Sequence, residues 1–420
     1  MPNESKTEVL IAGAGPVGMF TAALLAKAGV EVDLFDREPG IAARSYACSL
    51  HPATLRLLDR IGLADEVLKA GRRIDRIAFY EGTERRAELK LSSLPSKYPF
   101  VVSLPQLALE SLLEAQLSRA TRTKVHWSHR VAWVRPEQDR VAAGVHQLTR
   151  TSEGYSVPTW EWVVGKTLER RASLVVGADG HHSTTRQSLG IEYERIAGPD
   201  HFAVYEFESD EPVNDEIRVV LHENTTNVLW PLPGNRFRWS FQFDPTRAES
   251  DFPEKDRSGV IIEHKAGTEA KRGEMRRFLG KRAPWFTASI EDISWAVDVP
   301  FERRLAKEFG RGRCWLAGDA AHQTAPAAMQ SMNVGFREAA LLTDMLVEIL
   351  RGNGGVNLLE DYGREQRAEW RRLLCIDGKP KPRDTASPWV AAHAGKVLPC
   401  VPASGEDLLI LLNVLGLEFA

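Results

Sequence analysis

Three glycines near the start of the chain have the spacing needed to hold a phosphate group. In TEVLIAGAGPVGMFTAALLAKAGVEVDLFDRE (7–38), Gly13, Gly15 and Gly18 form the pattern GxGxxG. The first glycine allows a sharp turn, the second lets the backbone approach a pyrophosphate, and the third lets a helix pack on a strand. A helix that begins here directs free N–H groups and a positive dipole end at the phosphate.

A carboxylate ends the second apolar run of the same segment. Asp36 follows VEVDLF, at the place where a carboxylate accepts hydrogen bonds from both hydroxyls of an adenosine ribose. The same charge repels a 2′-phosphate, so the sequence predicts FAD or NAD as the resident nucleotide rather than NADP. The alternative is a glycine turn followed by an incidental surface aspartate.

Two further motifs follow apolar strands later in the chain. VVGADGHHSTTR (175–186) carries Asp179 and Gly180, and RCWLAGDAAHQTAPAAMQSMNVG (313–335) carries Asp319. In this order and approximate spacing, the three motifs resemble those of single-component FAD-dependent aromatic hydroxylases, the para-hydroxybenzoate hydroxylase-like flavoprotein monooxygenases. The resemblance covers about residues 7 to 372.

This resemblance implies tightly but non-covalently bound FAD, with NAD(P)H as a transient reductant, because no second GxGxxG lies in a strand–turn–helix context. It places Asp179 near the pyrophosphate, Asp319 on a ribityl hydroxyl, and Arg44 and Gln106 at the cofactor. Backbone N–H groups around Met332 and Asn333 would stabilise the negative charge of reduced flavin. The expected FAD contacts are Gly13, Gly15, Pro16, Val17, Gly18, Asp36, Arg37, Arg44, Gln106, Val131, Asp179, Gly180, Gly318, Asp319, Pro326, Met332 and Asn333.

The loop APAAMQSMN (325–333) departs from the family's glycine-rich pattern. Ala328, Met329 and Ser331 stand where that pattern prefers glycine. Two of these residues are small, whereas the flexible Met329 side chain either packs into the core, which we expect, or covers the flavin and hinders oxygen.

The resemblance implies that NAD(P)H and O2 are used to hydroxylate an aromatic molecule through a flavin C4a-hydroperoxide. A flavin oxidase or dehydrogenase, and a non-catalytic flavoprotein, remain as alternatives. A halogenase is disfavoured. WEWVV (160–164) superficially resembles the tryptophan-pair motif of flavin-dependent halogenases, but it precedes the Asp-Gly segment and lacks the Ile-Pro ending of that motif.

The segment NVLWPLPGNRFRWSF (227–241) predicts a hairpin that lines the substrate pocket. Alternation places Trp230 and Leu232 on one face of the first arm, and Arg238 and Ser240 on one face of the second. Leu232 stands where benzoate hydroxylases use an arginine, which argues against a simple benzoate and favours a larger, less charged phenolic or heteroaromatic substrate. Catalytic candidates are Arg238 and, for deprotonating a phenol, Tyr205 and His222.

These elements imply an α/β fold: a Rossmann-like FAD-binding domain interrupted by a smaller, mostly antiparallel β-sheet substrate domain, with C-terminal helices. We expect the FAD-binding domain at 1–76, 101–190 and 300–372, the substrate domain at 77–100 and 191–299, and a C-terminal helical extension at 373–420. That extension either covers the pocket or joins a homodimer interface.

Composition argues against several other classes of function. The formal charge of −3 gives no reason to expect nucleic acid as a partner. The four cysteines lie at no metal-ligand spacing, which predicts no metal site and suits a reducing cytoplasm. The uncharged run from Val9 to Ala26 is interrupted by the glycine turn, so we expect no membrane span. The basic stretch KRGEMRRFLGKR (271–282) is interpreted as a solvated face.

Overall fold

The computed structural model describes residues 7–41, 47–153, 159–212, 214–244, 263–264 and 269–419. In this part of the chain, eight strands form a sheet with the order β18-β19-β11-β1-β2-β8, to which β10 and β9 add an antiparallel meander. The strands β19, β11, β1, β2 and β8 run parallel. The bounds are β1 Thr7–Ala12, β2 Val32–Phe35, β8 Thr123–His126, β9 His129–Pro136, β10 Val141–Glu153, β11 Thr159–Gly177, β18 Gly310–Arg311 and β19 Cys314–Leu316.

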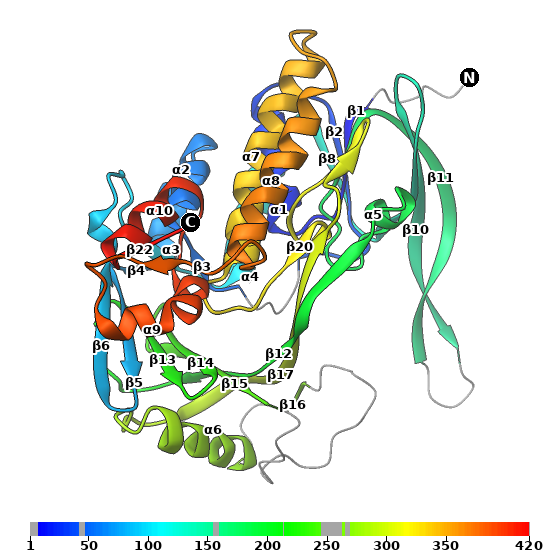
Figure 1. The fold of residues 1–420 in the computed structure, drawn as a ribbon. Coiled ribbons are helices and arrows are strands. Elements are labelled where there is room, and N and C mark those ends of the chain that lie inside the picture. Colours follow the sequence, from blue (N-terminus) through cyan, green and yellow to red (C-terminus); the bar gives the residue numbers. More distant parts are fainter. Residues whose placement is uncertain are drawn as a thin grey trace.

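Long helices pack beside this sheet (Figure 1). Helix α1 (Pro16–Lys27) begins with proline at its first position, where no N–H is needed. Its Phe20 ring lies 4.7 Å from Phe336 of α7 (Gln330–Leu350). The other helices here are α4 (Gln106–Leu117), α5 (Thr184–Ser188) and α8 (Leu358–Leu373). Burial of apolar side chains thus fixes α1 and α7 together at one end of the parallel strands.

A second sheet is antiparallel except where β13 pairs with β5. Its order is β16-β17-β12-β15-β14-β13-β5-β6, with β20 beside β17. The bounds are β5 Arg76–Glu81, β6 Glu84–Lys90, β12 Tyr193–Glu208, β13 Glu216–His222, β14 Thr225–Pro231, β15 Arg236–Phe243, β16 Glu263–His264, β17 Glu291–Ala306 and β20 His322–Gln323. Figure 1 shows α6 (Glu269–Arg282) covering one face, with the parallel-sheet body beyond the other.

The α/β fold class is confirmed, and the proposed domain boundaries stay a prediction. The segment after β3 forms two helices, α2 (Pro52–Arg60) and α3 (Ala64–Ala70), which are separated at Gly62 with φ +76°. The solvated-face interpretation of 271–282 holds for Arg276, Arg277 and Lys281, which are exposed, but not for Lys271 and Arg282, which are buried against the sheet. Lys271 pairs there with Glu274, which removes the need for water around its charge.

The remaining elements lie around 47–103 and in the C-terminal part. β3 (Ser49–Leu50), β7 (Val101–Ser103) and β4 (Arg72–Ile74) form a small antiparallel sheet, and the turn η1 covers Leu91–Ser93. The turn η2 covers Gly318–Ala320. The C-terminal elements are β21 (Lys381–Pro382), α9 (Pro388–Val397), η3 (Leu398–Cys400), α10 (Gly405–Val414) and β22 (Leu417–Glu418). None of the described helices is long and apolar enough to cross a membrane.

Candidate functional site

The three glycines of the first motif have different geometric reasons to be glycine. Gly13 has φ +97°, and a Cβ there would lie 2.2 Å from the Ala178 carbonyl oxygen. A Cβ at Gly18 would lie 1.9 Å from the Gly13 carbonyl oxygen, so this glycine permits the close approach of helix to strand. A Cβ at Gly15 would meet no atom within 4 Å. Gly15 therefore borders open space, and it lines the cavity described below.

Asp36 closes the turn from the end of β2. Its Oδ2 accepts a hydrogen bond from the Ala14 N–H at 2.6 Å, and its Oδ1 accepts one from the Glu38 N–H at 2.8 Å. Burial raises the pKa of the Asp36 carboxyl, although these two N–H donors act to lower it. Each carboxylate oxygen has a further lone pair, so both can still accept from a ligand hydroxyl.

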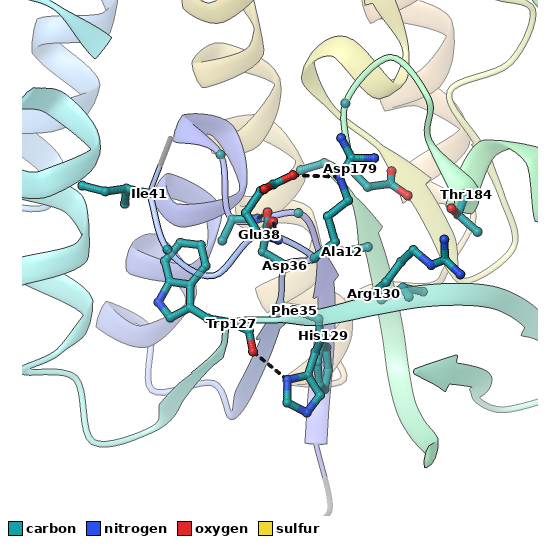
Figure 2. A pocket seen from close by; sticks show the side chains of 18 of the residues that line it. Ala12, Phe35, Asp36, Glu38, Ile41, Trp127, His129, Arg130, Asp179 and Thr184 are labelled. Carbon is teal, nitrogen blue, oxygen red and sulfur yellow. Dashed lines mark hydrogen bonds and ion pairs between the residues drawn. The ribbon is translucent and has the colours of Figure 1, made fainter. Parts of the chain in front are cut away.

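A cavity of about 270 Å³ opens at this end of the parallel sheet. Figure 2 shows Asp36, Trp127 and Asp179 around the same space, each from a different element. The predicted cofactor residues that line it are Gly13, Gly15, Asp36, Arg37, Gln106, Val131, Asp179 and Gly180. Arg44 lies outside the described residues. Strands β1, β2, β8 and β11 all end here, as expected for a ligand site in an open parallel sheet.

The polar atoms in this cavity fit the adenosine and pyrophosphate half of FAD. Asp179 Oδ2 accepts from the Thr185 N–H at 3.0 Å and the Thr185 hydroxyl at 3.1 Å. Asp179 Oδ1 is buried with no hydrogen-bond partner among the described residues. A buried acceptor without a partner is costly unless a ligand or water donates to it. The open backbone at Gly15 and the Asp36 carboxylate complete a set suited to phosphate and ribose.

A second group of predicted residues surrounds η2. Gly318 has φ +65°, and a Cβ there would lie 3.1 Å from Val17, so η2 lies against the first turn of α1. The Asp319 carbonyl accepts from Tyr193 Oη at 3.1 Å. Burial raises the pKa of the Asp319 carboxyl, while His322 and the Ser331 hydroxyl act to lower it. The turn thus presents Asp319 beside the start of α7.

Arg186 connects the two groups of cofactor residues. Its Nη1 donates to the Ala320 carbonyl at 2.7 Å, and its Nη2 donates to the His181 carbonyl at 2.8 Å. Its guanidinium also lies 3.9 Å from the centre of the Tyr193 ring. Ser183 caps α5 by accepting from the Arg186 N–H at 2.9 Å. The Ser and Arg that follow the Asp-Gly pair therefore brace both loops.

Two buried side chains fasten the loop 325–333 to the segment after β3. His51 Nε2 donates to the Ala328 carbonyl at 2.7 Å, and burial lowers the pKa of His51 to about 4. Asn333 Oδ1 accepts from the His51 N–H and the Thr54 hydroxyl, each at 2.8 Å. Asn333 Nδ2 donates to the Met329 carbonyl at 2.8 Å. The Asn333 amide is thus engaged by protein, leaving the first backbone N–H groups of α7 to face a ligand.

Met329 has the backbone geometry that explains the family's preference for glycine. Its φ and ψ are 54° and 39°, in the left-handed region. The side chain is only 6% exposed and belongs to the main hydrophobic core. The expectation that Met329 packs into the core is confirmed. Pro326 and Met332 are likewise buried.

The predicted substrate residues lie on one face of the antiparallel sheet. Trp230 pairs with Arg238, and Val228 pairs with Ser240, so these side chains share a face. Leu232 follows Trp230 on the same face and is buried. A neighbouring cluster of Phe202, Val204, Trp295, Val297 and Val299 packs against Ala325 of the loop. This face is therefore the one directed at the proposed flavin site.

Arg238 is the principal charge on this face. It is 2% exposed and donates through Nε to Glu206 Oε1 at 2.9 Å. Its guanidinium lies 5.2 Å from the centre of the Trp295 ring. Interactions with Cys48 and Glu206 raise the Arg238 pKa against the opposing effect of burial, so it stays cationic.

The two general-base candidates lie on the wrong face. Tyr205 pairs with Trp239 and packs in the cluster that includes Met275 and Phe278 of α6. Burial raises the pKa of Tyr205 well above its ordinary value. His222 shares its face with Val220 of the same cluster, because both have even positions in β13. Both residues therefore lie on the face of the sheet that is opposite to Arg238 and Ser240, and their assignment as general bases stays a prediction that this placement does not support.

Some site residues had weak sequence signals. Trp127 and Ile41 line the cavity. Trp127 follows β8, and the rule that ligands bind beyond the carboxyl ends of parallel strands could have identified it. No local sequence pattern reveals the roles of His51, Gln330 and Glu338, because their hydrogen-bond partners lie far away in the sequence. The described residues contain no cluster of three or more metal-ligating side chains.

Comparisons with known proteins agree with this geometry. The family model described as FAD binding domain matches residues 6–376. The chain is 30% identical over 380 residues to 6-methylpretetramide 4-monooxygenase of Streptomyces rimosus, covering 89% of this chain and 61% of that one. It is 27% identical over 379 residues to pentachlorophenol 4-monooxygenase of Sphingobium chlorophenolicum, covering 87% and 63%. The chain thus spans about three-fifths of the length of these relatives.

A solved structure supports the fold independently. The chain superimposes on p-nitrophenol 4-monooxygenase from Pseudomonas putida DLL-E4 with a TM-score of 0.71 at 20% identity, over 98% of this chain and 96% of that one. At this identity the likeness concerns the fold alone. With the family model matching most of the chain, and glycine, Asp36 and Asp179 geometry that fits the cofactor, the chain belongs to the FAD-binding domain family.

Proposed function

We propose that the protein is an FAD-dependent monooxygenase that uses NAD(P)H and O2 to hydroxylate a phenolic or heteroaromatic small molecule. The observation that carries this proposal is the position of the Trp230–Arg238–Ser240 face. It lies opposite the loop before α7, with Ala325 packed against the adjoining apolar cluster. A flavin held by that loop would have across from it an apolar wall that contains the buried Arg238–Glu206 ion pair.

The two groups of predicted residues divide the cofactor between them. Gly13, Gly15, Asp36, Asp179 and Gln106 would hold the adenosine and pyrophosphate half. Asp319, Pro326 and the first N–H groups of α7 around Met332 would hold the ribityl chain and flavin. When bound, FAD supplies the electron transfer and the oxygen activation that the protein's own side chains cannot provide.

The names of the relatives support an aromatic substrate. They include pentachlorophenol 4-monooxygenase and 6-methylpretetramide 4-monooxygenase. Arg238 and Glu206 form a buried ion pair on this face, which is a polar feature within the otherwise apolar wall. Trp230 Nε1 has no hydrogen-bond partner among the described residues and can donate to a substrate oxygen. Phe202, Val204 and Val297 exclude water from the ring.

The proposal is tested with isotopically labelled O2. The FAD-loaded protein is supplied with NADH or NADPH and a series of phenols, and the products are analysed by mass spectrometry. We expect one labelled oxygen atom per product and NAD(P)H oxidation that is faster with the accepted phenol. An oxidised product without labelled oxygen would instead show an oxidase or dehydrogenase. FAD binding with no NAD(P)H oxidation for any phenol would contradict catalysis altogether.

A further inference from the structure

The C-terminal segment Pro388–Asp407 connects the substrate sheet with the loop before α7. At its start, Trp389 Nε1 donates to Glu81 Oε2 of β5 at 3.0 Å. Lys396 Nζ donates to the Glu223 carbonyl at 2.5 Å, in the turn between β13 and β14. At its end, Asp407 Oδ2 accepts from Arg56 Nη2 of α2 at 2.8 Å. The segment therefore bridges elements far apart in sequence.

The middle of this segment is part of the protein interior. Val397, Leu398, Cys400, Val401 and Ala403 are each at most 2% exposed. Pro399 and Pro402 alternate with these residues and restrict the backbone. Because this run is buried in the interior, its backbone carbonyl groups need hydrogen-bond donors from the protein.

Gln330 supplies those donors from the first residue of α7. Its Nε2 donates to the Val401 carbonyl at 2.7 Å and to the Ala403 carbonyl at 3.1 Å. Because both partners are carbonyls, the amide nitrogen must face them. Gln330 is 5% exposed, so water does not replace these bonds. Its neighbours Ala328 and Met329 are held by His51 and Asn333, respectively.

We propose that Gln330 is a positioning residue that fastens the loop 325–329 to the C-terminal segment. That segment would then be a third wall of the aromatic site, beside the substrate sheet and the flavin. This inference rests on the proposed function. Its consequence is that the distance between loop and substrate sheet is set by residues 388–407, which reach the sheet through Trp389 and Lys396. The size of the accepted aromatic molecule is then determined partly by this segment.

The test compares Gln330→Met with Gln366→Met in the full-length, FAD-loaded protein. Methionine keeps the volume of glutamine and removes both donated hydrogen bonds. Gln366 is a matched control, because it is a 2% exposed glutamine on α8. Amide hydrogen exchange is followed by mass spectrometry at 325–329 and 398–404, and KM and kcat are measured for 4-nitrophenol and 1-naphthol.

For Gln330→Met we expect exchange to quicken about tenfold or more in both segments, because the two hydrogen bonds that join them are lost. We also expect KM to change more than kcat, by different factors for the two phenols. Exchange that quickens in only one segment, or equally in Gln366→Met, would overturn the proposal. If the wild type turns over neither phenol, the proposed function is in question, while the exchange experiment still decides whether Gln330 fastens the two segments.

Discussion

The glycines and Met329 show how backbone geometry, rather than side-chain chemistry, determines which residues occupy the turns of the proposed cofactor site. Gly13 needs a positive φ and Gly15 needs empty space. Met329 adopts a left-handed conformation that costs a non-glycine residue about 1–2 kcal/mol. Burying its side chain offsets that cost, since removing a buried methionine side chain loses about 2–5 kcal/mol. The loop therefore tolerates a methionine where glycine is usual.

Alanine substitutions at Gly13 and Gly15 should have different consequences. Gly13→Ala places a Cβ 2.2 Å from a backbone oxygen, so we expect the free energy of unfolding to fall by about 3 kcal/mol. Gly15→Ala meets no protein atom, so stability should change by less than about 0.5 kcal/mol. The FAD dissociation constant should nevertheless rise about tenfold or more, because the methyl group would enter the cavity. Urea denaturation of the apoprotein and flavin fluorescence titration measure the two effects, and equal stability losses would contradict this assignment.

The buried carboxylate of Glu338 joins three elements at the scale of secondary structure. Its Oε2 accepts from the Gly318 N–H and from His322 Nε2, each at 2.8 Å. Its Oε1 accepts from Trp370 Nε1 of α8 at 2.7 Å. The His322 ring also stacks on Trp370 at 3.8 Å. Helix α7 thereby holds η2, and with it Asp319, in a fixed position against α8.

We expect Glu338→Gln to affect both stability and cofactor binding. The amide retains one acceptor oxygen but places N–H groups against donors, and lost hydrogen bonds to a buried charged group cost about 2–3 kcal/mol. FAD should bind about tenfold more weakly, because η2 presents Asp319 to it.

The matched control for this substitution is Glu274→Gln on α6, which is also buried. It should lower the unfolding temperature without changing FAD affinity. Thermal unfolding and flavin fluorescence separate the outcomes. An unchanged FAD affinity in Glu338→Gln would show that η2 does not depend on this carboxylate.

At the scale of the whole molecule, buried polar contacts join the parallel-sheet body, the loop before α7 and the C-terminal segment. His51 is one such junction, with 1% of its surface exposed and its Nε2 bonded to the Ala328 carbonyl. Because burial lowers its pKa to about 4, the folded protein holds this imidazole neutral. The same histidine in the unfolded chain takes up a proton near pH 6.5.

Folding stability should therefore fall as the pH falls. Between pH 6.5 and 4 the unfolded state binds more protons at His51 than the folded state does, so stability is complete above pH 6.5 and is lost on acidification. A shift of this size corresponds to about 3 kcal/mol. His51→Gln, whose amide can still donate to Ala328, should remove that part of the pH dependence, whereas His146→Gln on β10 should not. Urea denaturation of the three proteins at pH 4 and pH 7 gives six free energies of unfolding, and an identical pH dependence for wild type and His51→Gln would refute this role.

Local patterns were sufficient for the parts of the protein built from neighbouring residues. The GxGxxG turn, Asp36 and the Asp-Gly segment each depend on a strand followed by a turn, so their spacing predicted the positions that now line one cavity. Strand alternation likewise predicted that Trp230 and Leu232 share a face.

The alternation of side chains along a strand could not decide which face of the sheet is directed at the proposed flavin site. Tyr205 and Arg238 lie on adjacent strands with similar composition, and only the packing of α6 shows that Tyr205 faces away from the loop before α7. The contacts of Glu338, Gln330 and His51 join segments separated by long stretches of chain. The positions of the cofactor motifs could be predicted from the sequence alone, because their geometry is local. The proposed substrate face and the packing of the C-terminal segment could be inferred only from the tertiary structure, because they depend on which distant surfaces pack together.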